Sequence, residues 1–595
     1  MQATAIGSVK TTFRLTLENS WRFKPRCHLE NHSTKCGCLK PFIKTGLLED
    51  WMRYVEFEKS NGEMLFEEID PIKTPLHKSA STILNGSTLV FSWLVRKKHG
   101  RLIHIFHCAD FDDVKLGDTE HSLLDNQDLR HAYDEFNMGY PFTFDNVVET
   151  LEGSRWEFFP QHLCPKLENK AFGNKLYIPF CRQEAVTQAG ATAVVYVTTI
   201  QEEFVSDQVR PLLGPRVDDE NYGICYRLAI KTISETRWNE YSQERRAFKG
   251  IDDKRGMLRC LGSYNSIDER GHKYYNILLE FADMNLHDFF RALDPPQLAK
   301  EVCSQWAEFC QIAAAIETLH HFDYEGSTWS GWHGDIKPRN LLRVGKEWKL
   351  ADYGFTVFIA ESPGGSPKTQ LKEFTQTWGA PETVQQGTWV LQTVDTWSFG
   401  CVLSIAATWM IKGIKGVIEY QEYRSQDRPS DAFHHDGDVL PQIRIWHDHL
   451  KQLIRQSDHI TGPILDVVEK HLLLKNPEAR LKSSELKATL DAIVARARES
   501  LASQCPMDTG LARALKYVKD HPTEWIVSYK SPMKDGYDAT KPTGSLPAIG
   551  QLPPTDQPET QSSLGSAVQE RLNARSSSPE ASSQTGATDP RFEGL

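Results

Sequence analysis

The sequence lacks the features of secreted and membrane-spanning chains. Its N-terminus, MQATAIGSVKTTFRLTLENSW, has no apolar core of about 7 to 15 residues, which a signal peptide needs. Nowhere do about 18 apolar residues run together, the length that a membrane helix requires. We therefore expect a cytoplasmic or nuclear protein whose partners do not include a membrane.

The sequence also has fewer basic than acidic residues. The chain has 68 Lys and Arg residues against 79 Asp and Glu residues, which gives a formal net charge of −11. A negative chain without a long basic run is soluble, but it repels the phosphates of nucleic acids and of anionic lipids. The composition therefore argues against nucleic acid as a partner.

Cysteine is sparse, with 12 residues spread over 595. In a reducing compartment such cysteines are free thiols rather than a disulfide framework. One local cluster contains Cys27, His28, His32, Cys36 and Cys38, but its spacing matches no common zinc module. We interpret this cluster as free thiols on a loop and keep metal binding as the alternative.

What is present divides a chain too long for one core into several regions. Residues 1–170 are mixed in character and of unknown role: LLEDWMRYVEFE has helical spacing, whereas STLVFSWLVR and RLIHIFHCAD flank KKHG like the two strands of a hairpin. Residues 171–283 are strand-rich with one helix, and residues 284–500 are helix-rich. The pattern predicts an α+β fold in which a small lobe precedes a larger helical lobe.

Residues 501–595 form a C-terminal extension. Beyond about residue 540 its composition shifts to Pro, Ser, Thr, Gly and Gln, which cannot bury enough apolar surface to offset the entropy of ordering. We expect a disordered tail from that point. The tail, with its Ser-Pro pair at Ser578, and the N-terminal region are the two places where we expect partners to bind, if any do.

Residues that carry chemistry first appear in HGDIKPRN, residues 333–340. Its Asp335, Lys337 and Asn340 are followed by Asp352 in LADYGF, 17 residues after Asp335. If the two segments pair, the side-chain oxygens of Asn340 and Asp352 face the same point. Mg²⁺ bound to nucleotide phosphates requires such hard oxygen ligands, so we assign these two residues to a metal.

Three further motifs follow in order: WGAPE, which ends at Glu382, then Asp395 in VDTWSFGCVLS, and finally Arg480 in KNPEAR. With these motifs the sequence resembles the eukaryotic protein kinase family, and GWHGDIKPRNLL and DAFHHDGDVL are similar to a group of filamentous-fungal protein kinases. The resemblance implies a bilobal kinase fold, ATP and Mg²⁺ as cofactors, and a protein substrate. It also implies that Asp395 supports the catalytic loop and that Arg480 pairs with Glu382.

The resemblance gives roles to the other residues of the loop. Asp335 orients the substrate hydroxyl, and Lys337 neutralises charge on the transferring phosphoryl group. A Lys at this position, with a Thr before Ala-Pro-Glu that holds the Asp, resembles the Ser/Thr kinases. Thr375 matches that Thr, and Thr377 is the alternative.

Upstream, RLAIKTI resembles the family's Val-Ala-Ile-Lys strand. The resemblance implies that Lys231 binds the α- and β-phosphates and pairs with a Glu on the next helix. WNEYSQERRAF offers Glu244 as that Glu, with Glu240 second.

The phosphate-covering loop departs most from the family pattern. VTQAGATAVVYV keeps one of three glycines, Gly190, while Ala193 and Val195 stand where the last Gly and the Val belong. This register implies an insertion of roughly twenty residues, EEFVSDQVRPLLGPRVDDENYG, between the second and third strands.

An adenine site follows from the same register. KYYNILLEFADMNLHDFF resembles the segment that leads into the kinase hinge. The site then comprises Leu279 as gatekeeper, the backbone of Glu280 to Ala282 as polar anchors, and Val195, Ala229 and Leu342 around the base.

Two substitutions in the motifs leave the catalytic residues in place. Gly334 stands where the family has an Arg that pairs with an activation-loop phosphate, so we interpret it as a change of regulation. Tyr353 replaces Phe and is tolerable if its hydroxyl finds a partner. The loop that follows has Ser-Pro pairs at Ser362 and Ser366, which are either phosphorylation sites or ordinary loop residues.

Three functions compete. An active Ser/Thr protein kinase is favoured by Lys231, Asp335, Lys337, Asn340 and Asp352. A pseudokinase that binds nucleotide or partners as a scaffold is favoured by the degenerate glycine loop. A small-molecule kinase shares the Asp and Asn of the loop but usually lacks Ala-Pro-Glu, so we disfavour it.

Overall fold

A computed structural model gives the structure of the protein. It describes residues 9–503 except for residues 23–41, 56–57, 70–84, 118–122, 137–139, 166, 173–177, 187–192, 252–253, 269–270, 362–366, 372–374, 385–386, 427 and 429. The cysteine and histidine cluster at residues 27–38, Gly190, Ser362, Ser366 and the tail lie outside the described residues.

The N-terminal region is helical. Its elements are α1 (Val9–Ser20), the short strands β1 (Trp21–Arg22) and β2 (Phe42–Ile43), α2 (Thr45–Arg53), α3 (Asn61–Ile69), α5 (Thr88–Arg96), the 3₁₀ turn Gly100–Leu102, α6 (Ile103–Cys108), α7 (Asp113–Gly117), α8 (Gln127–Phe136), α9 (Phe144–Glu152) and α10 (Arg155–Phe158). These helices bury a core of their own around Leu48, Leu65 and Trp93, each fully inaccessible to solvent. The region is therefore a separate helical module.

The hairpin predicted for residues 87–110 is wrong, because both of its strands are helices, α5 and α6. The apolar runs there are nearly continuous, and periodicity cannot distinguish a buried helix from a buried strand in so short a run. The carboxylate of Asp113 starts α5 by accepting the backbone N–H groups of Leu89 and Val90 at 3.1 and 2.8 Å. This cap comes from a residue more than 20 positions downstream, so no local pattern reveals it.

A seven-stranded sheet forms the small lobe of the kinase-like part, as predicted for an α+β fold. Its strands are β3 (Leu167–Phe172), β4 (Phe180–Ala185), β5 (Ala193–Gln201), β6 (Arg216–Asp219), β7 (Gly223–Ser234), β8 (Cys260–Ile267) and β9 (Lys273–Glu280), in the order β3-β8-β9-β7-β5-β4, with β6 beside β7. All neighbours are antiparallel except β3 and β8. One helix, α11 (Trp238–Ile251), follows β7.

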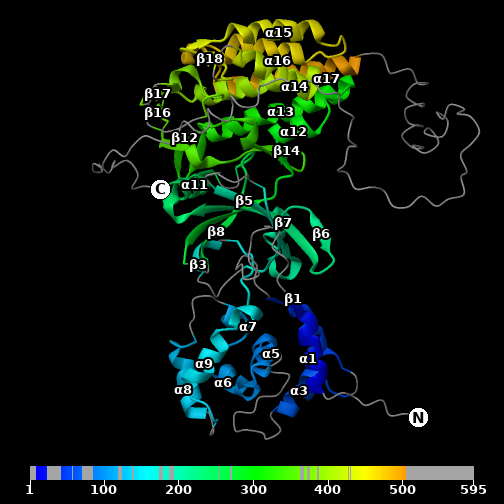
Figure 1. Ribbon diagram of the computed structural model, residues 1–595, viewed down its shortest axis with the longest axis vertical. Helices are drawn as coiled ribbons and strands as arrows, with labels where there is room; N and C mark the ends of the chain where they lie inside the picture. Colours follow the sequence, from blue (N-terminus) through cyan, green and yellow to red (C-terminus); the bar gives the residue numbers. More distant parts are fainter. Residues whose placement is uncertain are drawn as a thin grey trace, which may run out of the picture. The chain divides into compact units, whose positions relative to one another are not determined.

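The larger lobe is mainly helical. Its helices are α12 (Leu286–Ala292), α13 (Ala299–His320), α14 (Thr393–Ser425), α15 (Pro441–Leu453), α16 (Thr461–Val467) and α17 (Ser483–Ser503). Short strands lie between them: β10 (Met284–Asn285), β11 (Phe322–Tyr324), β12 (Ser327–Trp332), β13 (Leu341–Val344), β14 (Glu347–Leu350), β15 (Val357–Ala360), β16 (Thr369–Gln370), β17 (Trp389–Val390), β18 (His434–His435) and β19 (Asp438–Val439). Figure 1 shows helices α13 to α17 gathered together, and strands β5, β7 and β8 gathered beside α11.

Helix α14 is, among the described residues, the one helix whose length and composition suit a membrane span. Its most apolar 18-residue window has a mean hydropathy of 1.5, but 61% of that window is buried inside the structure. Trp397, Phe399 and Trp409 belong to the main core of the lobe. The core helix of a folded domain passes the same test, so this finding is weak evidence for a membrane span.

The insertion between β5 and β7 contains β6 and two 3₁₀ turns, Glu202–Phe204 and Arg210–Leu212. It also contacts the N-terminal module: the Glu203 carboxylate accepts the backbone N–H groups of Thr45 and Gly46 at 3.1 and 3.2 Å. Phe42 lies in one hydrophobic cluster with Phe204. The insertion thus ties the start of α2 to the sheet.

Candidate active site

Lys231 on β7 lies between two carboxylates. Its Nζ is 2.7 Å from Glu244 Oε2 on α11 and 2.7 Å from Asp352 Oδ1, which follows β14. Burial opposes the charge on the ammonium, but Glu244 and Asp352 raise the pKa of Lys231 well above its usual range. Glu240, the second choice from sequence, instead pairs with Arg237 at 2.9 Å.

The two carboxylates of this triad differ. Burial raises the pKa of Glu244 despite its contact with Lys231. Lys231 lowers the pKa of Asp352, whose side chain is 41% exposed. The geometry therefore presents a buried structural anion and an accessible one on either side of a fixed cation.

The HGDIKPRN loop holds a network around Asp335. Thr375 Oγ1 donates to one carboxylate oxygen at 2.6 Å, while Lys337 Nζ and Asn340 Nδ2 donate to the other at 2.6 and 3.0 Å. Lys337 also donates to Thr375 at 2.9 Å. Thr377 lies elsewhere and bonds Asp431 at 2.7 Å, so Thr375 is the Thr that meets the loop.

Asp395, at the start of α14, holds the loop backbone. Its buried carboxylate accepts the N–H groups of His333 and Gly334 at 2.8 and 3.0 Å. It also contacts His320 Nε2 at 3.1 Å. Burial alone would raise the pKa of Asp395, but His320 and the Gly334 N–H hold it below the ordinary value.

His320 is a residue that the sequence analysis missed. It ends α13, 13 positions before His333, and nothing in its local pattern distinguishes it from a surface histidine. The one local signal is its position, because it is a polar residue at the end of an otherwise apolar helical stretch.

Asn340 and Asp352 fit the metal site assigned from sequence. The amide nitrogen of Asn340 donates to Asp335, and one oxygen of Asp352 bonds Lys231, which leaves one side-chain oxygen on each for a hard cation. Among the described residues no group of three or more His, Cys, Asp or Glu forms a metal cluster. A cation here would therefore need phosphate and water oxygens to complete its shell.

One face of the sheet carries the residues assigned to adenine. Val195 stands opposite Lys231, and Leu279 opposite Ala229. Residues directly opposite one another, or two apart in one strand, project from the same face, so Ala193, Val195, Ala229, Lys231 and Leu279 share it. Gly190 lies outside the described residues.

The other residues assigned to the adenine site are Leu342, Ala282 and Glu280. Leu342 is on β13, opposite Asn285 of the hinge-side strand β10, and Ala282 precedes β10. The N–H of Glu280 donates to Arg259 O at 3.2 Å, and its carboxylate binds Lys349 at 2.6 Å. That N–H group of Glu280 therefore already has a partner within the protein.

Tyr353 finds partners for its hydroxyl. It accepts the N–H of Leu258 at 3.1 Å and donates to Leu350 O at 2.5 Å, and its ring is fully buried. The hydroxyl thus anchors the motif that carries Asp352 to the segment that precedes β8.

Gly334 adopts a left-handed conformation with φ of +76°. A Cβ atom there would lie 3.2 Å from Leu371 Cδ2 and 3.3 Å from Phe355 O. L side chains rarely adopt this conformation. The segment after Asp352 is held without an Arg at residue 334. Strand β15 pairs with β12. Glu361 accepts a hydrogen bond from Ser330 Oγ at 2.6 Å and contacts His321 Nδ1 at 2.8 Å.

The Ala-Pro-Glu motif is fastened to the larger lobe. The Arg480 guanidinium binds both oxygens of Glu382, at 2.6 and 2.8 Å, and lies 4.9 Å from the ring centroid of Trp397. This two-pronged ion pair is buried on the Arg480 side and orders the segment that carries Thr375.

Comparisons with known proteins agree with this geometry. Residues 221–489 match the model of the protein kinase domain. Relatives include a cyclin-dependent kinase 4 homolog of Caenorhabditis elegans, 32% identical over 22% of this chain and 28% of the relative, and mitogen-activated protein kinase 15 of Rattus norvegicus, 36% identical over 33% and 36%. The serine/threonine-protein kinase ppk23 of Schizosaccharomyces pombe is 28% identical over 35% of this chain and 51% of its own length.

The chain thus contains a protein kinase domain over residues 221–489, as its motifs predicted. The matched stretches span about a quarter to a half of these relatives' own lengths. The family match begins at residue 221, so β4, β5 and the N-terminal module fall outside it.

Proposed function

We propose that this protein transfers the γ-phosphate of ATP, with Mg²⁺, to Ser or Thr hydroxyls of protein substrates. The observation that carries the proposal is the presence of two networks, one that joins Lys231 to Glu244 and Asp352, and one that joins Asp335 to Lys337, Asn340 and Thr375. Phosphoryl transfer needs positioned charges rather than covalent catalysis, and these two networks supply them.

Each residue has a role in the proposed reaction. Lys231, fixed by Glu244, binds the α- and β-phosphates. Asp335 orients the substrate hydroxyl, and Lys337 offsets charge on the transferring group. Mg²⁺, when bound by Asn340 and Asp352, neutralises the phosphate oxygens. The contact of Lys337 and Thr375 with Asp335 supports the Ser/Thr assignment.

The test is γ-phosphate transfer from ATP and Mg²⁺ to the chain itself and to a generic basic protein. We expect Asp335→Asn and Asp352→Asn each to lower transfer at least about a hundredfold, because each removes a charge that acts on the reacting groups. Thr377→Val, outside the network, is the control and should retain activity. Transfer that survives both Asn substitutions would contradict the proposal.

We found no support for the pseudokinase alternative among the described residues, since every charged side chain that the chemistry needs is present. The pseudokinase alternative predicts that nucleotide raises the melting temperature of the wild type while no transfer is detected. The outcome of the same assay therefore separates the two functions.

We further propose that activity does not depend on a phosphate in the activation segment. Gly334 offers no guanidinium for such a phosphate, and Glu361 already supplies an anion that holds β15 to β12. Wild type treated with phosphatase should keep its transfer rate within about twofold. A loss of about tenfold or more, restored by rephosphorylation, would show that another cation has taken over the role.

We also propose that the protein is cytoplasmic or nuclear. The eight cysteines of the described residues are all free thiols, as expected in a reducing compartment. Fluorescence microscopy of the tagged full chain tests this.

A further inference from the structure

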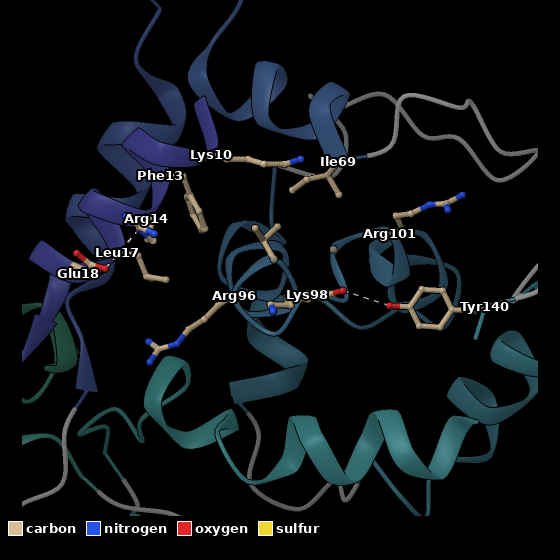
Figure 2. A pocket seen from close by; sticks show the side chains of 12 residues that line it. Lys10, Phe13, Arg14, Leu17, Glu18, Ile69, Arg96, Lys98, Arg101 and Tyr140 are labelled. Carbon is tan, nitrogen blue, oxygen red and sulfur yellow. Dashed lines mark hydrogen bonds and ion pairs between the residues drawn. The ribbon is translucent and has the colours of Figure 1, made fainter. Parts of the chain in front are cut away.

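The N-terminal module encloses a pocket of about 1120 Å³. None of the residues around it belongs to the kinase domain. Among the described residues its wall is formed by Lys10, Phe13, Arg14, Leu17, Glu18, Ile69, Val95, Arg96, Lys98, Gly100, Arg101 and Tyr140. Figure 2 shows Phe13, Arg14, Leu17 and Glu18 on one side of the view and Arg101 and Tyr140 on the other.

The rim of the pocket is strongly basic. Five cations line it, Lys10, Arg14, Arg96, Lys98 and Arg101, against one carboxylate, Glu18. The whole chain carries a net charge of −11, so this concentration of cations runs against its overall balance. A rim of one sign attracts ligands of the other sign and speeds their encounter.

The floor of the pocket is apolar and sterically tight. Phe13 and Leu17 of α1 are 4% and 6% exposed, and Ile69 and Val95 lie beside Gly100. A Cβ atom on Gly100 would lie 2.8 Å from Ile69 Cγ2 and 3.1 Å from Val95 Cγ2. The absence of a side chain at residue 100 therefore lets Ile69 and Val95 pack closely against the backbone and form the floor.

Lys98 is held on the rim at a conformational cost. Helix α5 ends with bonds from Lys98 N to Val95 O and from His99 N to Leu94 O, and Lys98 takes the left-handed position with φ of 64°. Gly is usual at that position, and an L residue there costs about 1 kcal/mol. Tyr140 braces the turn through His99 Nδ1 at 2.7 Å.

Lys98 also has no ion-pair partner among the described residues. In contrast, Lys10 lies 3.3 Å from Glu68 and Arg14 lies 3.7 Å from Glu18. Lys98 is thus a strained cation that lacks a carboxylate partner and lies above an apolar floor. This arrangement indicates a ligand-binding role rather than a contribution to the stability of the fold.

We propose that this pocket is a docking site for a short acidic segment of a partner protein. One or two large apolar side chains of the segment would fill the floor, and its carboxylates would meet the rim. The volume slightly exceeds the range of about 300 to 1000 Å³ typical of small-molecule sites, which favours a peptide. An amphipathic segment laid against a groove is a common mode of recognition.

The experiment selects ligands from a library of random 12-residue peptides displayed on phage, with the full chain as bait. We expect the selected peptides to combine Asp or Glu with Leu, Ile, Phe or Trp. Binding of a synthetic selected peptide should weaken at least tenfold for Lys98→Glu/Arg101→Glu. Lys97→Glu, which reverses one charge on the same turn but outside the pocket lining, should bind like wild type.

A second variant guards against unfolding. Lys98→Gly removes the cation and relieves the left-handed strain, so it should bind several-fold more weakly without a fall in melting temperature. Asp335→Asn should bind the peptide like wild type, which separates docking from catalysis.

Several outcomes would overturn the proposal. They are the failure to select any peptide, selected peptides without acidic residues, and equal binding by the Lys98→Glu/Arg101→Glu variant. Co-sedimentation with phosphatidylserine vesicles that this variant abolishes, without peptide binding, would instead assign the pocket to anionic lipid and would also overturn it.

Discussion

At the residue scale, the site depends on Lys231 and on the burial of its partner Glu244. Glu244 is 2% exposed, and its burial raises its pKa, so its charge is stable only beside the ammonium of Lys231. Breaking a buried ion pair from one side costs more than the pair contributes, because the remaining charge is left without a partner.

We therefore predict that Lys231→Met abolishes transfer and lowers the free energy of unfolding by about 3 to 5 kcal/mol. Adding Glu244→Gln to Lys231→Met should recover part of this loss, since the double variant buries no lone carboxylate. Urea unfolding of both variants measures the difference. A double variant no more stable than Lys231→Met would show that Glu244 is not charged in the folded protein.

At the element scale, helix α5 depends on a cap from a distant residue. The carboxylate of Asp113 accepts two N–H groups at the start of the helix, yet burial raises the pKa of Asp113 to about 7. Its ordinary value is 3.8. Between these two values the folded module binds a proton that the unfolded chain releases.

The sign of the resulting pH dependence follows from that difference. Because the folded state binds more protons, the free energy of unfolding falls as pH rises from about 4 to 7 and then levels off. We predict that protection of the amides of α5 against hydrogen exchange, corrected for intrinsic rates, is greater at pH 5 than at pH 8.

The matched variant is Asp113→Asn, because its amide side chain does not titrate between pH 5 and pH 8. It should show little change in this protection between pH 5 and pH 8. An equal pH dependence in wild type and Asp113→Asn would assign the effect to other groups.

The elements of the larger lobe show the same dependence on distant partners. Arg480 reaches Glu382 across 98 positions, and Asp395 reaches the loop across about 60. The two segments that meet at Asp335 are thus each held by a distant residue: Asp395 holds the loop that carries Asp335, and Arg480 holds the Ala-Pro-Glu motif that follows Thr375, whose Oγ1 donates one bond to Asp335.

At the scale of the whole molecule, the N-terminal module and the kinase lobe share a contact through Glu203. Burial raises the pKa of Glu203, while the N–H groups of Gly46 and Thr45 lower it. A buried acceptor of this kind stabilises two backbone donors that have no partner within α2.

We predict that Glu203→Ala lowers the free energy of unfolding of the module by about 1 kcal/mol, because two partly buried N–H groups lose their acceptor. Hydrogen exchange at Thr45 and Gly46 should rise in parallel. Glu220→Ala, an exposed carboxylate in the same insertion, is the control. Unchanged exchange at Thr45 and Gly46 would mean that the module is held by its apolar contacts alone.

The sequence by itself determined which residues the proposed chemistry uses. Asp335, Lys337 and Asn340 lie within eight positions, so their spacing is a local property and is readable without the fold. The order of Lys231, the loop, Asp352, Ala-Pro-Glu and Arg480 likewise indicated the family, since order along the chain needs no coordinates. The α+β organisation followed from periodicity over long segments, where the signal is strongest.

Only the tertiary structure decided which of these residues meet, because each contact joins positions far apart in the chain. It chose Glu244 over Glu240 and Thr375 over Thr377, and it brought His320 to Asp395. It also made residues 87–110 helical where the sequence predicted a hairpin, and it supplied a helix cap from Asp113 that no local pattern contains. The basic pocket has the same origin: its lining residues other than Tyr140 come from α1, α3, α5 and the turn after α5, and packing alone places them around one space.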